Sequence, residues 1–119
     1  MARELGARLE SEGYSAAVIN PRFIKPIDRD VLAQYAKSVA VFVTFEDHAK
    51  MGGFGSAVVE ALDEMGCTVP VVRIGWPDQF IEHGKVDDLR QKHGLSVDAA
   101  IKQTLPLLAG RRRPTLVAS

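Results

Sequence analysis

The chain of 119 residues is 46% hydrophobic and 25% charged, which is typical of one globular domain and excludes collagen-like and disordered classes. Fifteen Lys and Arg residues balance fifteen Asp and Glu residues, so the composition shows no basic face and nucleic acid is not an expected partner. Apolar stretches fall far short of the roughly 20 residues of a membrane span, so no membrane partner is expected. The single cysteine, Cys67, excludes an internal disulfide and favours a reducing, cytoplasmic setting.

Helical and strand patterns alternate along the chain. Apolar residues at helical spacing predict the helices, and short unbroken apolar runs, typical of buried strands, predict the strands. Side chains at Asp28, Asp87 and Ser96 can cap three of the helices, and Pro106 should end or kink the last one. In chain order we expect helix 2–12, strand 15–20, helix 28–38, strand 39–45, helix 57–65, strand 69–74, a short helix 87–93 and a last helix from 97.

This alternation predicts an α/β fold, a three-layer α/β/α domain over residues 1–109 with a mostly parallel sheet. A doubly wound unit normally opens with a strand, whereas here a helix comes first and three strands make a narrow sheet. We therefore expect a segment of a longer polypeptide whose first strand is missing. Residues 110–119 lack periodicity and are predicted to be a flexible tail, with the arginines at 111–113 in solvent.

Two neighbouring motifs follow the strongest predicted strand. The glycines Gly52, Gly53 and Gly55 precede a helix, where free amides could cradle an anion, although tight packing of helix on sheet explains such glycines equally well. Glu46 and His48 stand at the end of the strand, where open α/β sheets place functional groups. A carboxylate beside an imidazole could transfer a proton, but capping of the next helix or contact with another domain is an equally good interpretation.

The loop after the third predicted strand carries large apolar and titratable residues. Trp76, Asp78, Phe80 and His83 lie within it, so the loop either folds back onto its own sheet or meets a partner. The histidines and Cys67 lack the spacing of a metal site, and no nucleophile motif is present. We therefore predict no catalytic, cofactor-binding or metal-binding residue in this segment.

Three sequence blocks together resemble one family, the 1-deoxy-D-xylulose 5-phosphate synthases of the transketolase superfamily, in their C-terminal domain. The blocks are VINPRFIKPID at 18–28, TFEDHAKMGGFGSAVVE at 44–60 and VPVVRIGWPDQFIEHG at 69–84, and the resemblance covers roughly residues 2–109. Trp76 departs from the smaller apolar residue expected there, and the arginine tail is not a family signature.

The resemblance implies a thiamine diphosphate and Mg²⁺ dependent transferase of isoprenoid and thiamine biosynthesis. Such an enzyme joins pyruvate to glyceraldehyde 3-phosphate and releases CO₂. The family's cofactor motifs have no matching position here, so the resemblance implies a structural, dimer-supporting domain, inactive alone, whose partners are two other domains and a second subunit.

Two alternatives stay open at this point. One is a subunit-docking domain of the kind found in the beta subunits of 2-oxo acid dehydrogenases, with the loop 75–84 carrying the contact. The other is an independent module that binds small anions at residues 52–55.

Overall fold

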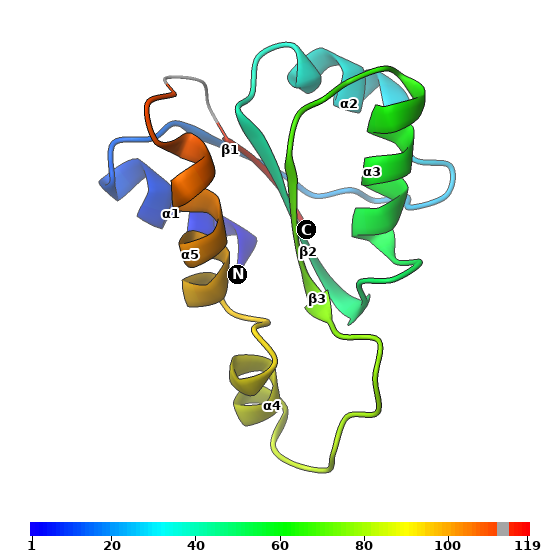
Figure 1. Cartoon of the computed structure of the whole chain (residues 1–119), viewed down its shortest axis with the longest axis vertical. Helices are drawn as coiled ribbons and strands as arrows, with labels where there is room; N and C mark the ends of the chain where they lie inside the picture. Colours follow the sequence, from blue (N-terminus) through cyan, green and yellow to red (C-terminus); the bar gives the residue numbers. More distant parts are fainter. Residues whose placement is uncertain (112–114) are drawn as a thin grey trace.

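A computed structural model describes residues 1–111 and 115–119 of the chain (Figure 1). Four strands and five helices alternate over this part of the sequence. They are α1 (Ala2–Ser11), β1 (Ala16–Ile19), α2 (Arg29–Ala36), β2 (Val41–Ala49), α3 (Phe54–Glu64), β3 (Val71–Trp76), α4 (Val86–Lys92), α5 (Val97–Leu108) and β4 (Thr115–Ala118).

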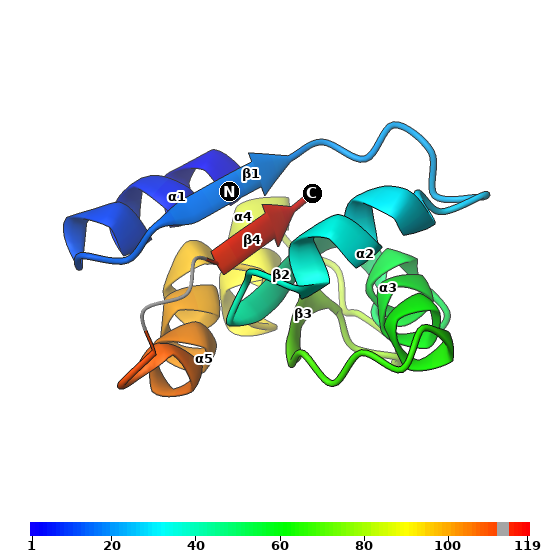
Figure 2. The ribbon, with the colours of Figure 1, turned by 90° about the horizontal axis from the view of Figure 1, so that it is seen from above.

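The strands form one parallel sheet in the order β1-β4-β2-β3. Helices α1 and α5 cover one face of the sheet, and α2 and α3 cover the other (Figures 1 and 2). The predicted α/β fold with helices on both sides of a parallel sheet is confirmed. Within the described ranges, no helix combines the length and apolar character needed to cross a bilayer.

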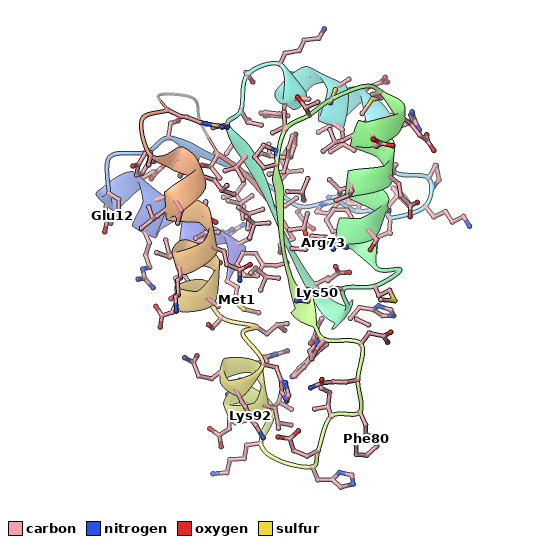
Figure 3. All side chains as sticks on the ribbon, viewed as in Figure 1. Met1, Glu12, Lys50, Arg73, Phe80 and Lys92 are labelled. Atoms are coloured by element: carbon pink, nitrogen blue, oxygen red, sulfur yellow. The ribbon has the colours of Figure 1, made fainter. Side chains whose placement is uncertain are left out.

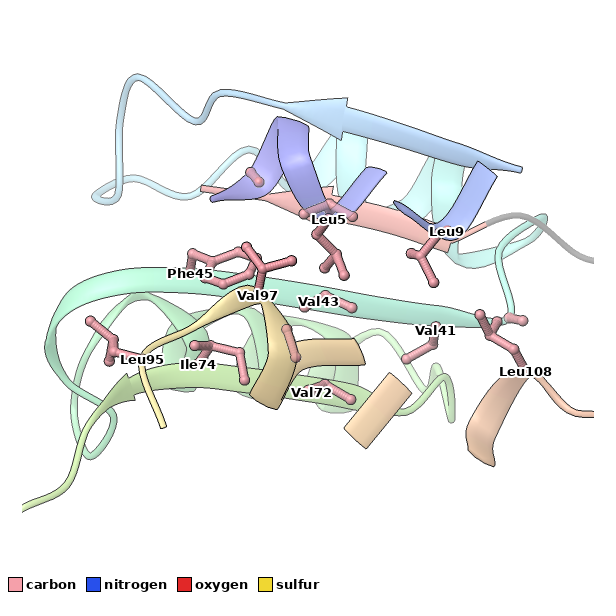
Figure 4. Packing of buried hydrophobic residues seen from close by; sticks show 14 residues of the cluster. Leu5, Leu9, Val41, Val43, Phe45, Val72, Ile74, Leu95, Val97 and Leu108 are labelled. Atoms are coloured by element: carbon pink, nitrogen blue, oxygen red, sulfur yellow. The ribbon is translucent and has the colours of Figure 1, made fainter. Parts of the chain in front are cut away.

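Strand β2 organises the core because both of its faces are buried. Val41 and Val43 pack toward α1 and α5, where Leu5 and Leu9 meet them (Figure 4). Phe42 points to the opposite face, between α2 and α3. The alternation of side chains along a strand thus feeds two apolar clusters, one under each helix layer.

Two of the three predicted helix caps are confirmed. Asp28 accepts a hydrogen bond from the amide of Val31 at 3.0 Å, and Ser96 accepts one from Ala99 at 3.2 Å. The predicted cap at Asp87 is wrong, because α4 already begins at Val86 and Asp87 lies in its first turn. Pro106 lies inside the last turn of α5, which continues to Leu108 rather than ending at the proline.

The predicted flexible tail at 110–119 is wrong for residues 115–118. Thr115–Ala118 form strand β4, fully buried between β1 and β2, so the sheet has four strands where three were predicted. Four residues are too few to show a periodicity, and their burial depends on strands far away in the sequence. Arg111 donates to the carbonyl of Ala40 at 3.5 Å; the prediction for the other two arginines falls outside the described residues. The missing first strand stays a prediction.

Candidate functional site

The C-terminal ends of the parallel strands meet at one edge of the sheet, the lower end in Figure 1. Functional groups of open α/β folds gather at this edge. Strand β2 brings Glu46, Asp47 and His48 to it, beside Trp76 at the end of β3. The pairing of the two strands shifts between Phe45 and Ala49, and such a bulge re-aims side chains. Glu46 and Asp47, consecutive in the strand and so on opposite faces, have different partners.

Glu46 occupies the N-terminus of α3. One carboxylate oxygen accepts from the amide of Phe54 at 2.6 Å and the other from the amide of Gly55 at 3.1 Å. These amides have no partner within the helix, and the helix dipole favours a negative charge there. The carboxylate therefore fills the place that an external anion would take. Among the three interpretations of Glu46, capping of the next helix is confirmed, and α3 begins three residues earlier than predicted.

Glycines near the connection between β2 and α3, here called the junction, leave space for the Glu46 carboxylate. A Cβ atom on Gly53 would lie 2.0 Å from Glu46 Oε2 and 2.5 Å from the carbonyl oxygen of Ala49. On Gly75 it would lie 2.8 Å from Glu46 Cγ, and on Gly55 it would lie 2.7 Å from the Thr44 hydroxyl. Gly52 has a φ of +71°, a left-handed conformation that glycine adopts without strain. Gly53 and Gly75 thus allow close packing around Glu46, whereas Gly55 allows close packing against Thr44 and Arg73.

Asp47 links three elements that the sequence keeps far apart. Its carboxylate accepts from the indole N–H of Trp76 at 2.7 Å and from the guanidinium of Arg90 on α4 at 2.7 Å. The Trp76 hydrogen bond, followed by the bond and charge of Arg90, lowers the pKa of Asp47 below its ordinary value of 3.8. Sequence reasoning missed this link, because nothing local connects residues 43 positions apart.

We expect Trp76 fluorescence to report the protonation of Asp47. Since the pKa of the folded-state carboxyl is lowered, its stabilisation is complete above pH 3.8 and is lost as the pH falls through the lowered value. With 60% of the Asp47 side chain exposed, that stabilisation is at most about 1 kcal/mol. A titration of the emission of Trp76, the single tryptophan, should show an acid step in the wild type that Asp47→Asn removes.

Asp87→Asn is the matched control, because Asp87 also lies near Arg90, at 3.6 Å, but makes no described contact with Trp76. Its acid step should match that of the wild type. An unchanged step in Asp47→Asn, with circular dichroism showing a folded domain, would contradict the assignment.

The segment 77–85 projects from the sheet as a loop that ends at α4. It carries three of the predicted site residues, Asp78, Phe80 and His83, and all three are exposed. Phe80 is 88% exposed and points away from the domain (Figure 3). Glu82 ties the loop to α4 through an ion pair with Lys92, and its carboxylate lies 3.3 Å from His93 Nε2. Chiefly because of the hydrogen bond from Lys92, the pKa of Glu82 falls to about 2.

An apolar pocket of about 660 Å³ opens on the α2 and α3 side of the sheet. The segment 20–27, the first turns of α2 and α3 and the ends of β1 and β4 enclose it. Phe23 lines it and is still 73% exposed, and its neighbour Ile24 is 56% exposed. Large exposed apolar side chains beside an apolar pocket are typical of a surface that meets another protein surface.

The structure brings together only part of the predicted site. Glu46, Gly53 and Gly55 form one cluster, with Gly52 in the turn just before it. Glu46 and His48 are not paired, since Glu46 turns to α3 and His48 Nδ1 lies 3.2 Å from the carbonyl of Ala49. Trp76, half-buried and bonded to Asp47, belongs to the fold rather than to an exposed anchor. The described residues contain no group of three or more His, Cys, Asp or Glu side chains placed to hold a metal ion.

The structure is an α/β domain with a parallel sheet covered by helices on both faces, and the carboxylates of Glu46 and Asp47 at the end of β2 are hydrogen-bonded within the same domain. Comparison with known proteins gives the family. The family model "Transketolase, C-terminal domain" matches residues 1–99. The 1-deoxy-D-xylulose-5-phosphate synthases of Acidobacterium capsulatum and Methylacidiphilum infernorum are 58% and 56% identical over 108 residues, which is 91% of this chain and 17% of each relative.

A solved structure described as "Split gene transketolase, inactive beta4 tetramer" superposes with a TM-score of 0.81 and 36% identity, covering 93% of this chain and 36% of that one. The chain belongs to the transketolase C-terminal domain family. It spans about one sixth of the length of the curated relatives it matches, at the scale of one domain of a longer enzyme.

Proposed function

We propose that this chain is the C-terminal supporting domain of a thiamine diphosphate dependent 1-deoxy-D-xylulose 5-phosphate synthase. The enzyme would condense pyruvate with glyceraldehyde 3-phosphate, release CO₂, and supply isoprenoid and thiamine biosynthesis in the cytoplasm. Its catalytic groups would belong to the other domains and to a second subunit of a homodimer. The identity of 58% to one such synthase over 91% of this chain supports the assignment.

We infer a supporting role because both carboxylates at the end of β2 are hydrogen-bonded within this domain. Glu46 is engaged by α3, and Asp47 by Trp76 and Arg90. The glycine-rich junction does not fit the diphosphate of the cofactor, because a carboxylate already holds its amides and would repel a second anion. The same fact weighs against an independent anion-binding module. We assign the diphosphate and Mg²⁺ to other parts of the enzyme.

Exposed apolar groups near this edge suit docking. Phe23 lines the apolar pocket, its neighbour Ile24 is 56% exposed, and Met51 in the turn before α3 is 71% exposed. Covering such side chains gives about 25 cal/mol per Å² of apolar surface. At this edge the carboxylates of Glu46 and Asp47 are hydrogen-bonded within the domain. The exposed apolar side chains would contact a neighbouring domain.

A chimaeric enzyme tests the proposal. The matching region of the Acidobacterium capsulatum synthase is replaced by this chain, and product formation is measured from pyruvate and glyceraldehyde 3-phosphate. A domain that makes no transition-state contact should keep kcat within about tenfold of the parent, equivalent to roughly 1.4 kcal/mol. This chain alone should form no product.

Phe23→Ala in the chimaera should weaken assembly, whereas Val59→Ala, at an exposed position of α3 away from the pocket, should not. A folded chimaera without activity would contradict the proposal. So would carboligation by the isolated chain.

A further inference from the structure

An aromatic side chain protrudes from this domain at one place, and an apolar pocket opens into it at another. The side chain is that of Phe80, 88% exposed in the loop 77–85, where it points away from the domain (Figure 3). The pocket is the one of about 660 Å³ beside α2 and α3, and its walls include the buried side chains of Leu32, Phe42 and Phe54. A protruding apolar group and an apolar pocket on one molecule can form a contact between copies of that molecule.

The protruding side chain and the pocket are kept apart within one copy. The loop that carries Phe80 follows β3, whereas the segment 20–27 that encloses the pocket follows β1, and these strands form opposite edges of the sheet. The ion pair of Glu82 with Lys92 holds the loop against α4. Phe80 therefore stays outside the pocket of its own chain and is accessible to another molecule.

The charges around the two features are opposite. Phe80 has a carboxylate two positions away on either side, and one of them, Asp78, makes no ion pair among the described residues. The segment that encloses the pocket carries Arg22 and Lys25, which also make no described ion pair, and Arg22 lines the pocket. Asp28, a carboxylate in the pocket lining, is occupied as the cap of α2. Opposite charges orient two surfaces as they approach each other.

We infer that two copies of this chain form a reciprocal pair, in which Phe80 of each copy fills the apolar pocket of the other and Asp78 faces Arg22. In a two-fold pair the same contact occurs twice. The second contact forms between copies that are already joined, which strengthens the pair. The inference rests on the docking role proposed above for the exposed apolar side chains, and it names the same domain of a second copy as the neighbour.

Mixing two defective variants tests the inference. Phe80→Ala removes the inserted side chain and leaves the pocket, whereas Val31→Trp fills the pocket from the first turn of α2 and leaves Phe80. Each variant alone should dimerise at least about 30-fold more weakly than the wild type, because it loses the central contact in both places. In a mixture, one copy keeps the pocket and the other keeps Phe80. The two variants should therefore pair with each other about tenfold more tightly than either pairs with itself, as measured by sedimentation velocity with one variant labelled.

Matched variants control for changes elsewhere on the surface. Val86→Ala, at a side chain 55% exposed on α4, and Val59→Trp, at an exposed position of α3 outside the pocket lining, should dimerise as the wild type does. If circular dichroism shows that Val31→Trp does not fold, an exchange of charges takes its place. Arg22→Asp and Asp78→Arg should each weaken pairing by up to about fivefold, and the double variant should regain the wild-type affinity.

Three results would overturn the inference. One is a wild-type chain that stays monomeric up to about 1 mM, which would leave the pocket to a different neighbour. Another is wild-type dimerisation of Phe80→Ala. The third is a mixture of folded variants, or a double charge variant, that pairs no more tightly than its single components. Self-association is measured without enzyme activity, so failure here is distinguishable from failure of the chimaeric enzyme.

Discussion

Replacing Gly53 by alanine should lower the free energy of unfolding by at least about 3 kcal/mol, the upper end of the range for overpacked sites. The new Cβ would lie 2.0 Å from Glu46 Oε2 and 2.5 Å from the carbonyl oxygen of Ala49. The side chain of Glu46 can move aside, but the backbone carbonyl cannot. Because the φ of Gly53 is −86°, a value ordinary for alanine, the loss comes from contact and not from backbone strain.

Urea unfolding of a graded series measures this effect. Gly55→Ala meets the Thr44 hydroxyl and the flexible Arg73 side chain at 2.7 to 3.0 Å and should lose less. Gly84→Ala, whose Cβ would find only Leu89 at 3.4 Å or more, should stay close to the wild type. Equal stability of the three variants would contradict the packing of the junction.

Replacing Glu46 by glutamine should lower the free energy of unfolding by about 2 kcal/mol, the scale of hydrogen bonds to a charged group. The amide keeps the shape of the carboxylate but turns one acceptor into a donor, which then faces the amide of Phe54 or Gly55. It also removes the negative charge from the positive end of the α3 dipole. The loss should show as a shifted urea midpoint with an unchanged slope.

The control for Glu46→Gln is Glu60→Gln, an exposed carboxylate on the same helix that makes no described ion pair. Its change should stay within about 0.5 kcal/mol, as at most surface positions. If both glutamine variants behaved alike, the helix would not depend on the Glu46 carboxylate, and the argument against an anion site at residues 52–55 would lose its basis.

The sequence predicted those helices and strands whose local residue pattern agrees with the way they pack in the fold. Periodicity and capping residues predict three of the strands and the helix starts at Asp28 and Ser96, because these features depend on neighbours within a few residues. The end of β2 was also predictable as a place for polar groups, with capping of α3 among the interpretations. What the pattern could not show is the register shift between Phe45 and Ala49 in the pairing of β2 with β3.

Long-range contacts account for the rest. The partnership of Asp47 with Arg90 and the insertion of β4 join residues that are distant in the chain. No spacing rule applies to such pairs, since the fold creates their proximity. Phe80, by contrast, was singled out correctly as a large apolar residue in a loop, but only the structure separates it from Trp76, which packs against the core.

The loop at 77–85 is fastened at both ends. Asp47 holds Trp76 just before it and Arg90 beyond it, while Glu82 joins Lys92 and lies against His93. A loop already held in one conformation gives up little conformational entropy when its tip is covered. A neighbouring surface that covered Phe80 would therefore lose less free energy to ordering the loop than it would with the same side chain on a mobile loop.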